Sequence, residues 1–373
     1  MLIDPTQFKK YYSLHYTMKI FYSGEYSDRD LLFADIWKKI LPKSSNFLCF
    51  AHLDTYKKLD VLALSQKLEQ DKHSPVIFFL TGQQIDVKII NDVIGSRENV
   101  FIINDSGFND KNYFAITTSH RAWKGYIGAV PFVPHKQRKY TLSALCHRYE
   151  TARWLLLAKI KNHNINSCLA FHNVNKITAE SFYSLCQAEL ATSPDDAVMD
   201  AIEQLIKKAP VRPDFLSDPN GVGDFYNKWQ QTDLSAHVRS RINATLEGSY
   251  IDTGCGVNLT EKMAKCLAAG TFPLHIGQTG GFSRLIEWGF DGFENCGLDL
   301  SYDQMQGDFL SAKFRSDKIK KIYALIDSIG DDLDVEQVCK NNYDWFHGGW
   351  YNHCESLNEP KIQRLQEALN HCI

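Results

Sequence analysis

The sequence predicts an α/β protein with two domains, each built on a mainly parallel β-sheet. The chain has 373 residues, which is more than one ordinary hydrophobic core holds. Short apolar runs alternate with segments of helical spacing in both halves, and this rhythm is typical of buried parallel strands linked by helices. Several runs end at glycine or polar residues, as strands do at the carboxyl edge of such a sheet.

The composition narrows the class of protein. Hydrophobic residues make up 44% and charged residues 23%, as in globular proteins, and the net charge of -3 gives no overall attraction to nucleic acid. No apolar run is long enough to span a bilayer, and the N-terminus lacks the apolar centre of a signal peptide. The ten cysteines form no Cys-x-x-Cys pair, so we expect a cytoplasmic protein with reduced thiols. A zinc site from His347, His353 and Cys354 would match no standard spacing.

In the first half, apolar runs predict a series of strands. These runs are Met18–Tyr22, Phe47–Phe50, Pro75–Leu80 and Val100–Ile103. Segments of helical spacing separate them at residues 31–40, 62–68 and 87–94. A helix-free stretch with Trp123, Tyr126 and Phe132 is expected to close this domain, and Pro131 and Pro134 mark a hinge.

The same pattern restarts after Arg138. Strands are expected at residues 139–145, 168–171 and 241–246, with helices near 150–159 and 316–329 and a polar helical segment over 177–233. An aromatic segment, residues 343–351, is expected mainly to pack against the rest of the chain. We therefore expect an N-terminal domain at residues 1–136, a second domain at 137–330 and a C-terminal tail at 331–373 that packs back.

The stretch from Ala244 to Asp303 predicts a strand, a helix, a second strand and a second helix. Thr260 is a good N-cap for the first helix, and Gly270 stands where a C-cap glycine belongs. The apolar run Phe272–Ile276 leads through a glycine-rich loop into the next helix. Backbone N–H groups and helix N-termini at this edge of a parallel sheet suit an anionic ligand.

The order of motifs in this stretch resembles a known family. The series is Thr260-Glu261-Lys262, a helix of small residues, a strand ending at Gly277, then Gly289-Phe290 and finally Asp299-Leu300-Ser301-Tyr302-Asp303. It is similar to the nucleotide-sugar domain of glycosyltransferases of the fucosyltransferase/exostosin-like type, which have bacterial and phage relatives. The resemblance implies a GT-B fold, in which two Rossmann-like domains face across a cleft. Leu300 departs from the family pattern, which has an acidic residue there, and the N-terminal half carries no resemblance.

The resemblance also implies which residues hold the donor. Lys262 would contact phosphate and Glu261 the ribose or base, while an arginine, Arg148 or Arg153, would contact the diphosphate. A guanidinium suits this task because its fixed fork of donors matches two phosphate oxygens. The acidic residues at the end of the series either bind the donor or cap a helix. The candidate donor-binding residues are Thr260, Glu261, Lys262, Arg148, Arg153, Gly277, Gly280, Asp299, Tyr302 and Asp303.

Glycosyl transfer also needs a base that removes the acceptor proton. Glu25, Asp54 and Asp105 each follow a strand of the first half, where a carboxylate serves either as a base or as a helix cap. His52 and His120, in the same half of the chain, rank behind these three carboxylates as candidates for the base. Members of the GT-B class work with protein cations, so we expect neither an obligatory metal nor another cofactor beside the nucleotide-diphosphate sugar.

The sequence thus predicts an enzyme that moves a sugar from a nucleotide-diphosphate sugar to a saccharide hydroxyl. A lipid-linked precursor of a cell-surface glycan is the expected acceptor, which would bring the protein to the inner face of a membrane. One alternative is a phage-type transferase acting on DNA bases, which needs basic clusters such as residues 135–139 and 318–321. Another alternative is a protein that binds nucleotides or sugars without turnover.

Overall fold

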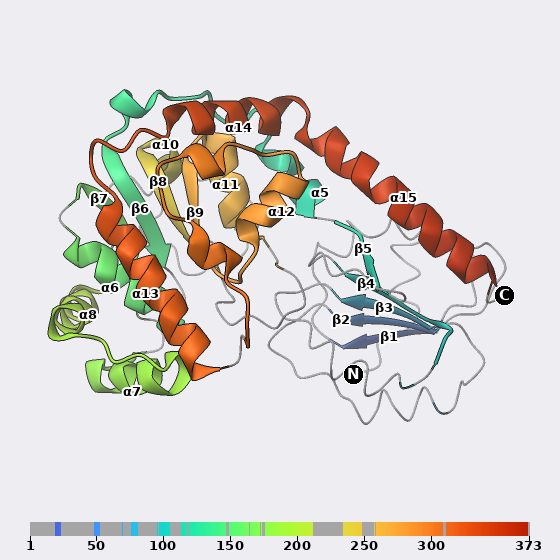
Figure 1. Ribbon diagram of the computed structural model, residues 1–373, viewed down its shortest axis with the longest axis horizontal. Coiled ribbons are helices and arrows are strands. Elements are labelled where there is room, and N and C mark those ends of the chain that lie inside the picture. The colour runs from blue at the N-terminus through green and yellow to red at the C-terminus, as the bar shows by residue number, and fades with distance from the viewer. Residues whose placement is uncertain are drawn as a thin grey trace. The chain divides into compact units, whose positions relative to one another are not determined.

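The chain forms two separate parallel β-sheets in a mixed α/β architecture consistent with a Rossmann-like fold (Figure 1). The computed structural model describes residues 19–23, 48–52, 69, 76–80, 95, 97–104, 113–117, 119–146, 149–163, 165–171, 173, 176–211, 234–247, 257, 259–308 and 311–371. The chain divides into two compact units, of which the first comprises Met1–Ala122, Thr253–Asn258 and Tyr351–Ile373 and the second comprises Trp123–Asp252 and Leu259–Trp350. The expected domain boundaries lay at residues 136–137 and 330–331. Each unit is described below by itself.

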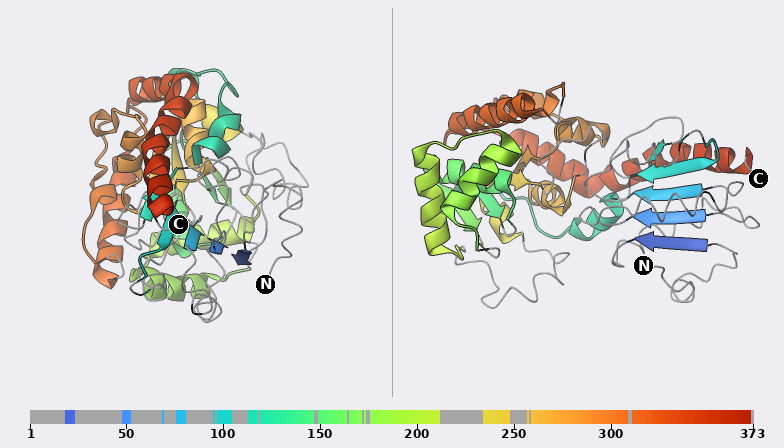
Figure 2. Two further views of the ribbon diagram at one scale, coloured as in Figure 1. Left: turned by 90° about the vertical axis from the view of Figure 1, so that its right-hand side faces the viewer. Right: turned by 90° about the horizontal axis from the view of Figure 1, so that it is seen from below.

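The first sheet has its strands in chain order, and every neighbouring pair is parallel (Figure 2). Its strands are β1 (Lys19–Ser23), β2 (Leu48–His52), β3 (Val76–Leu80), β4 (Val100–Asn104) and β5 (Tyr113–Ala115). The first four confirm the apolar runs expected to be strands. The fifth strand was not expected, because three residues are too few to show a periodic pattern. The helices expected at 31–40, 62–68 and 87–94 lie outside the described residues.

Helix α15 (Trp350–His371) covers the edge strand β5. Asn358 accepts a hydrogen bond from the N–H of Thr117 (2.9 Å) and donates one to its carbonyl oxygen (2.7 Å), as a neighbouring strand would. The Arg364 guanidinium lies 4.7 Å from the centre of the Phe114 ring. The same guanidinium donates to the carbonyl oxygen of Tyr113 in β5 (3.3 Å), so the backbone of the open sheet edge is partly paired.

The stretch after β5 is not free of helix, which corrects the sequence prediction. It contains α5 (Ser119–Trp123) and the 3-10 helix η1 (Lys124–Tyr126). Helices of one turn show no apolar repeat, so their sequence resembles that of a loop. Trp123 is buried beside Trp288 and Trp350 in the second unit, with ring centres 5.4 and 5.5 Å apart, respectively. The aromatic residues of the C-terminal segment therefore serve packing at this position, as expected.

The second sheet has the strand order β7-β6-β8-β9 and is also parallel throughout. Its strands are β6 (Tyr140–Cys146), β7 (Ser167–Phe171), β8 (Ser240–Leu246) and β9 (Phe272–Ile276). Helix α6 (Thr151–Asn162) joins β6 to β7, and α11 (Glu261–Ala269) joins β8 to β9. Between β7 and β8 lie α7 (Ala179–Leu190), α8 (Asp196–Lys208) and α10 (Ser235–Val238). After β9 come α12 (Gly281–Glu287), α13 (Ala312–Ser328) and α14 (Glu336–Gly348).

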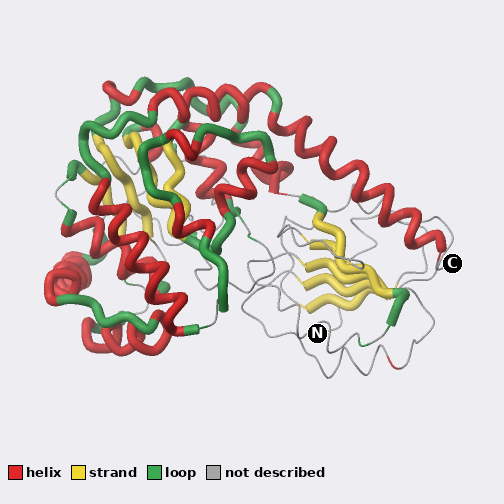
Figure 3. The backbone as a smooth tube through the Cα atoms, in the orientation of Figure 1, coloured by secondary structure: helices red, strands yellow, loops and turns green. Residues whose placement is uncertain are grey.

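Helices cover both faces of this second sheet (Figure 3). Helix α6 packs with α7, α8 and α13, whereas α11 packs with α10 and α14. Opposite faces are expected, because right-handed crossovers that run toward opposite edges of a sheet place their helices on opposite sides. Residues Trp154 to Leu157 of α6 have no exposed surface at all, so this helix is buried nearly all round.

The predicted caps of α11 are confirmed. The Thr260 hydroxyl accepts a hydrogen bond from the backbone N–H of Lys262, and Gly270 ends the helix in the left-handed region at φ 60°. Helix α13 begins earlier than expected, at Ala312 rather than near Ser316, because the Ser311 hydroxyl caps it by accepting the N–H of Phe314 (3.1 Å).

Candidate functional site

The strand order of the second sheet reverses between β6 and β8. The chain moves outward from β6 to β7, then crosses back to β8 on the other side and continues to β9. The two central strands therefore send their following helices in opposite directions. In open α/β sheets, ligands bind outside the carboxyl ends of the strands at such a reversal. Arg153, a predicted donor residue, lies in α6 after β6. The predicted series Thr260-Glu261-Lys262 lies at the start of α11, after β8.

Arg153 reaches this point from the first turn of α6, after β6. Its Nε donates to the backbone carbonyl oxygen of Glu247 (3.0 Å), and its Nη2 lies 3.4 Å from a carboxylate oxygen of Glu150. The arginine is 8% exposed, so its position is set by surrounding protein rather than by solvent. Arg148, the other arginine candidate, lies outside the described residues.

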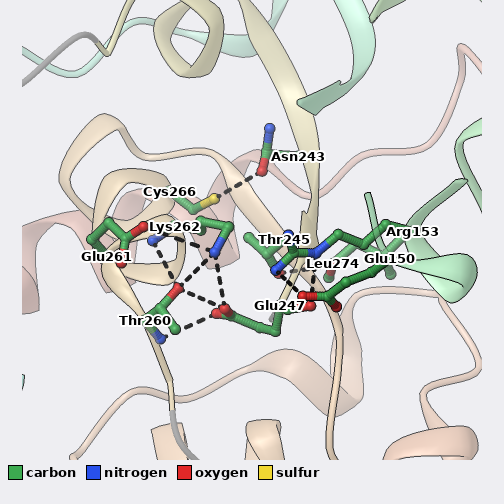
Figure 4. Close-up of polar contacts among 10 residues, drawn as sticks. All are labelled: Glu150, Arg153, Asn243, Thr245, Glu247, Thr260, Glu261, Lys262, Cys266 and Leu274. Atoms are coloured by element: carbon green, nitrogen blue, oxygen red, sulfur yellow. Dashed lines mark hydrogen bonds and ion pairs between the residues drawn. The ribbon is translucent and has the colours of Figure 1, made fainter. Parts of the chain in front are cut away.

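Glu247 follows β8 directly and is the centre of a polar cluster (Figure 4). Its side chain is 2% exposed, and its carboxylate accepts hydrogen bonds from the hydroxyl (2.6 Å) and the backbone N–H (3.2 Å) of Thr260. Lys262 Nζ lies 3.4 Å from the same carboxylate. A buried carboxylate is stable only when it is paired and hydrogen-bonded, and this one is both.

The predicted series Thr260-Glu261-Lys262 starts α11 and belongs to this cluster. Lys262 Nζ donates to the Thr260 hydroxyl (3.2 Å) and lies 3.8 Å from a carboxylate oxygen of Glu261. The side chains of Lys262 and Glu261 are 29% and 24% exposed, whereas Glu247 beneath them is closed to solvent. The structure thus brings Thr260, Glu261 and Lys262 together with Glu247, whose backbone carbonyl contacts Arg153, and their role in donor binding stays a prediction.

The cluster holds its own counter-charges. Among its described residues there are two cations, Arg153 and Lys262, and three carboxylates, Glu150, Glu247 and Glu261, so the formal sum is -1. An anionic ligand would bind here by taking hydrogen bonds that the cations now make to protein oxygens. Cys146, at the end of β6, is no nucleophile for this site, because burial raises the pKa of its thiol to about 12 despite the nearby Arg153.

The glycine-rich loop before α12 is closed by an acidic residue. Asp303 is 1% exposed, and its two carboxylate oxygens accept the backbone N–H groups of Gly281 (3.0 Å) and Phe282 (2.8 Å). Its backbone carbonyl accepts the N–H of Gly280 (2.8 Å). Burial raises the pKa of Asp303, although His275 and the two amides act in the opposite direction. Asp303 therefore caps α12, the helix before it in sequence, whereas a cap on the following helix was one expected alternative.

The rest of this loop is also held by internal contacts. Lys318 is buried and its Nζ donates to the carbonyl oxygen of Gly277 (2.6 Å) and the hydroxyl of Thr279 (3.1 Å). Tyr302 donates its hydroxyl to the carbonyl oxygen of His275, and Asp299 accepts the N–H of Ser301 (2.9 Å). This bond, together with the Ser301 hydroxyl, lowers the pKa of the exposed Asp299. These contacts give Asp299, Tyr302 and Asp303 local structural roles. Gly277 and Gly280 lie in a loop whose conformation is stabilised by hydrogen bonds to other protein groups.

Of the residues considered as a source of the base, the structure describes the side chain of His120 alone. Glu25, Asp54 and Asp105 lie outside the described residues, as does the side chain of His52. His120 has no exposed surface, and its Nε2 lies 2.7 Å from a carboxylate oxygen of Glu355. Burial alone would raise the pKa of Glu355, but hydrogen bonds from Arg121 and His120 bring it down to about 2. This ion-paired group joins α5 to α15 within the first unit and gives His120 a structural role.

Each of the two basic clusters is partly buried. Arg138 donates to five protein oxygens, among them the carbonyl of Ala269 at the end of α11 (2.8 Å). His135 is buried as well, and so is Lys318 in the other cluster. The other lysines of the two clusters, Lys136, Lys139, Lys320 and Lys321, are exposed.

Sequence reasoning missed Glu247 and Glu150. Glu247 directly follows a predicted strand, the same signal that selected Glu25, Asp54 and Asp105 in the first half, so the criterion was available. Within the described part of the chain, no group of three or more His, Cys, Asp or Glu residues is arranged to hold a metal ion, and no helix is long and apolar enough to cross a membrane. Seven cysteines are buried, namely Cys146, Cys168, Cys186, Cys266, Cys296, Cys339 and Cys354.

The chain was compared with known proteins. No protein-family model matches it, and no curated protein matches it either.

Proposed function

We propose that the second unit binds a nucleotide-diphosphate sugar and that the protein is a glycosyltransferase of the two-domain GT-B type. One observation carries the proposal. Arg153 and Lys262, the cations that the family resemblance assigns to the donor diphosphate, come from different helices and meet at Glu247, where the strand order reverses. Strand reversals of this kind are where parallel sheets bind nucleotides.

Each residue of the cluster has a task in this proposal. Lys262 and Arg153 stabilise the negative charge that develops on the departing nucleotide diphosphate, which lowers the barrier to transfer. Glu261, partly exposed beside Lys262, accepts hydrogen bonds from the ribose or base. The acceptor hydroxyl loses its proton to a carboxylate of the first unit, for which Glu25, Asp54 and Asp105 remain the candidates. No metal or further cofactor is part of the proposal.

A saccharide is the acceptor that we propose, in the synthesis of a cell-surface glycan on a lipid-linked precursor. Duplex DNA would require several phosphate contacts from exposed cations. The burial of Arg138, His135 and Lys318 removes three of the side chains that could have made them. The exposed lysines Lys136, Lys139, Lys320 and Lys321 are what these clusters still offer to the DNA-modifying alternative.

A nucleotide screen tests the donor half of the proposal. Thermal unfolding would be followed with GDP, UDP, CMP and dTDP, and we expect one or two of them to raise the midpoint because a ligand that binds only the folded state stabilises it. Nucleotide release from the matching sugar donors, measured with saccharide acceptors and with DNA containing hydroxymethylated bases, then identifies the acceptor. Stabilisation without release would favour a binding protein without turnover, and no stabilisation by any nucleotide would contradict the proposal.

A further inference from the structure

Glu247 is held from four directions. Its backbone N–H donates to the carbonyl oxygen of Ile276 in β9 (2.8 Å), which extends the β8–β9 pairing by one residue. Its backbone carbonyl accepts Arg153 Nε, and its carboxylate accepts Thr260 and Lys262. A side chain with this many partners has one position, and groups bonded to it inherit that position.

The neighbouring strand makes room for this arrangement. A Cβ atom added at Gly277 would lie 2.8 Å from Glu247 Cβ, closer than non-bonded carbon atoms approach. The glycine at this position, selected from the sequence as a donor-binding residue, therefore has a physical reason that concerns Glu247. Any larger residue would push Glu247 away from the end of β9.

We propose that Glu247 is a positioning residue that sets the spacing of Arg153 and Lys262 for the two phosphates of a diphosphate. Its main chain holds one cation and its side chain holds the other, so two helices on opposite faces of the sheet are aligned by one amino acid. Lysine is a flexible side chain with a compact charge, and holding it in place before the ligand arrives reduces the entropy lost on binding. The inference rests on the proposed function, because it presumes that these cations bind a diphosphate.

A role for Glu247 as a counter-charge alone predicts the opposite change in anion affinity. If Glu247 were only a counter-charge, replacing it with a neutral residue would raise the charge of the cluster from -1 to 0 and strengthen anion binding. If Glu247 positions the cations, the same replacement weakens binding of a diphosphate in particular. A single phosphate, which needs only one cation, is affected less.

Calorimetric titration with inorganic pyrophosphate and inorganic phosphate distinguishes these roles. We expect Glu247→Gln to weaken pyrophosphate binding about tenfold and phosphate binding about twofold. Asp195→Ala serves as a control, because Asp195 caps α8 by accepting the N–H of Val198 (2.8 Å) and is in none of the contacts of the cluster. It should lower stability without changing either affinity.

A double-mutant cycle shows whether Glu247 acts through Lys262. In the Lys262→Ala background, Glu247→Gln should have little further effect on pyrophosphate, because the cation that it positions is gone. Should Glu247→Gln fail to fold, Gly277→Ala displaces Glu247 without removing its charge and should weaken pyrophosphate binding in the same way. Equal or tighter pyrophosphate binding by Glu247→Gln, or by Gly277→Ala in that case, would overturn the inference and leave the proposed function intact. Wild-type protein that binds neither pyrophosphate nor any nucleotide would overturn both.

Discussion

Helices α11 and α12 both begin at the carboxyl edge of the second sheet, yet their N-termini are built in different ways. At α12, the buried carboxylate of Asp303 accepts the N–H groups of Gly281 and Phe282. These N–H groups are therefore already occupied and do not serve an anionic ligand. At α11, the cap is the hydroxyl of Thr260, which is shared with the ammonium group of Lys262, whose side chain is partly exposed. One helix start is closed by the protein, and the other presents a cation to solvent.

This difference shows that glycine content is a poor guide to an anion site. The loop before α12 has the glycines and the helix that a phosphate-binding loop requires, but an acidic residue from further along the chain already supplies the anion. The start of α11 has a less conspicuous sequence and carries the accessible charge. Whether a helix N-terminus can bind a ligand depends on what already occupies its N–H groups.

The largest effect that this comparison predicts is on stability at α12. Asp303→Ala leaves two N–H groups in a buried position without an acceptor, and we expect the free energy of unfolding to fall by about 2–4 kcal/mol. Chemical denaturation followed by tryptophan fluorescence measures this. Asp299→Ala is the control, because its exposed carboxylate accepts one N–H and should cost at most about 1 kcal/mol. Loss of nucleotide affinity without loss of stability in Asp303→Ala would break the comparison.

At α11 the largest effect should be on binding. Lys262→Ala removes a charged donor to phosphate, so we expect affinity for the stabilising nucleotide to fall by about 1.5–3 kcal/mol, measured by calorimetry. Lys320→Ala removes a lysine that is 74% exposed and paired only locally with Asp317, and it should leave the affinity unchanged. Glu261→Ala should weaken binding of the nucleoside alone. If folded Lys262→Ala and Glu261→Ala both bind like the wild type, the donor assignment is wrong.

The opposite end of α11 predicts a pH effect that is separate from the ligand site. Burial, with help from Arg138, lowers the pKa of His135 to about 4, and burial with Lys265 lowers that of His237 to about 3. Below pH about 6.5 these histidines take up protons in the unfolded chain but stay neutral in the folded chain. As the pH is lowered from 6 to 4, the free energy of unfolding should therefore decrease by up to about 1.4 kcal/mol per pH unit for each histidine. In His237→Leu the slope of stability against pH should be smaller, and an unchanged slope would contradict this assignment.

The smallest effect should come from the cap of α11. Thr260→Ala removes the hydroxyl that accepts the N–H of Lys262, and we expect a loss of about 1 kcal/mol in the free energy of unfolding. Thr260→Ser keeps the hydroxyl and should retain most of the stability. A loss as large as that of Asp303→Ala would mean that the two helix starts are not built differently in energetic terms.

Much of the fold was predictable because it depends on local signals. The apolar runs that became β1 to β4 and β6 to β9 carry their burial in their own composition, and Thr260 and Gly270 mark α11 by the chemistry of caps. Strand β5 and helix α5 escaped prediction because three to five residues show no period. Of the donor candidates, Lys262 and Arg153 were selected by their match to motifs of the resembled family, and their donor role stays a prediction.

The sequence alone determined that strands and helices alternate, where most of them begin and end, and which short motif opens α11. These are properties of residues that are near one another in the chain. Only the tertiary structure decided that Glu247, Arg153 and Lys262 meet, that Asp303 closes α12, and that Lys318 and Arg138 are buried. Each of these contacts joins residues from separate elements, and the order of strands in the sheet brings them together. A side chain's function depends on its partners, and strand order is set by packing across the whole sheet, not by any one segment.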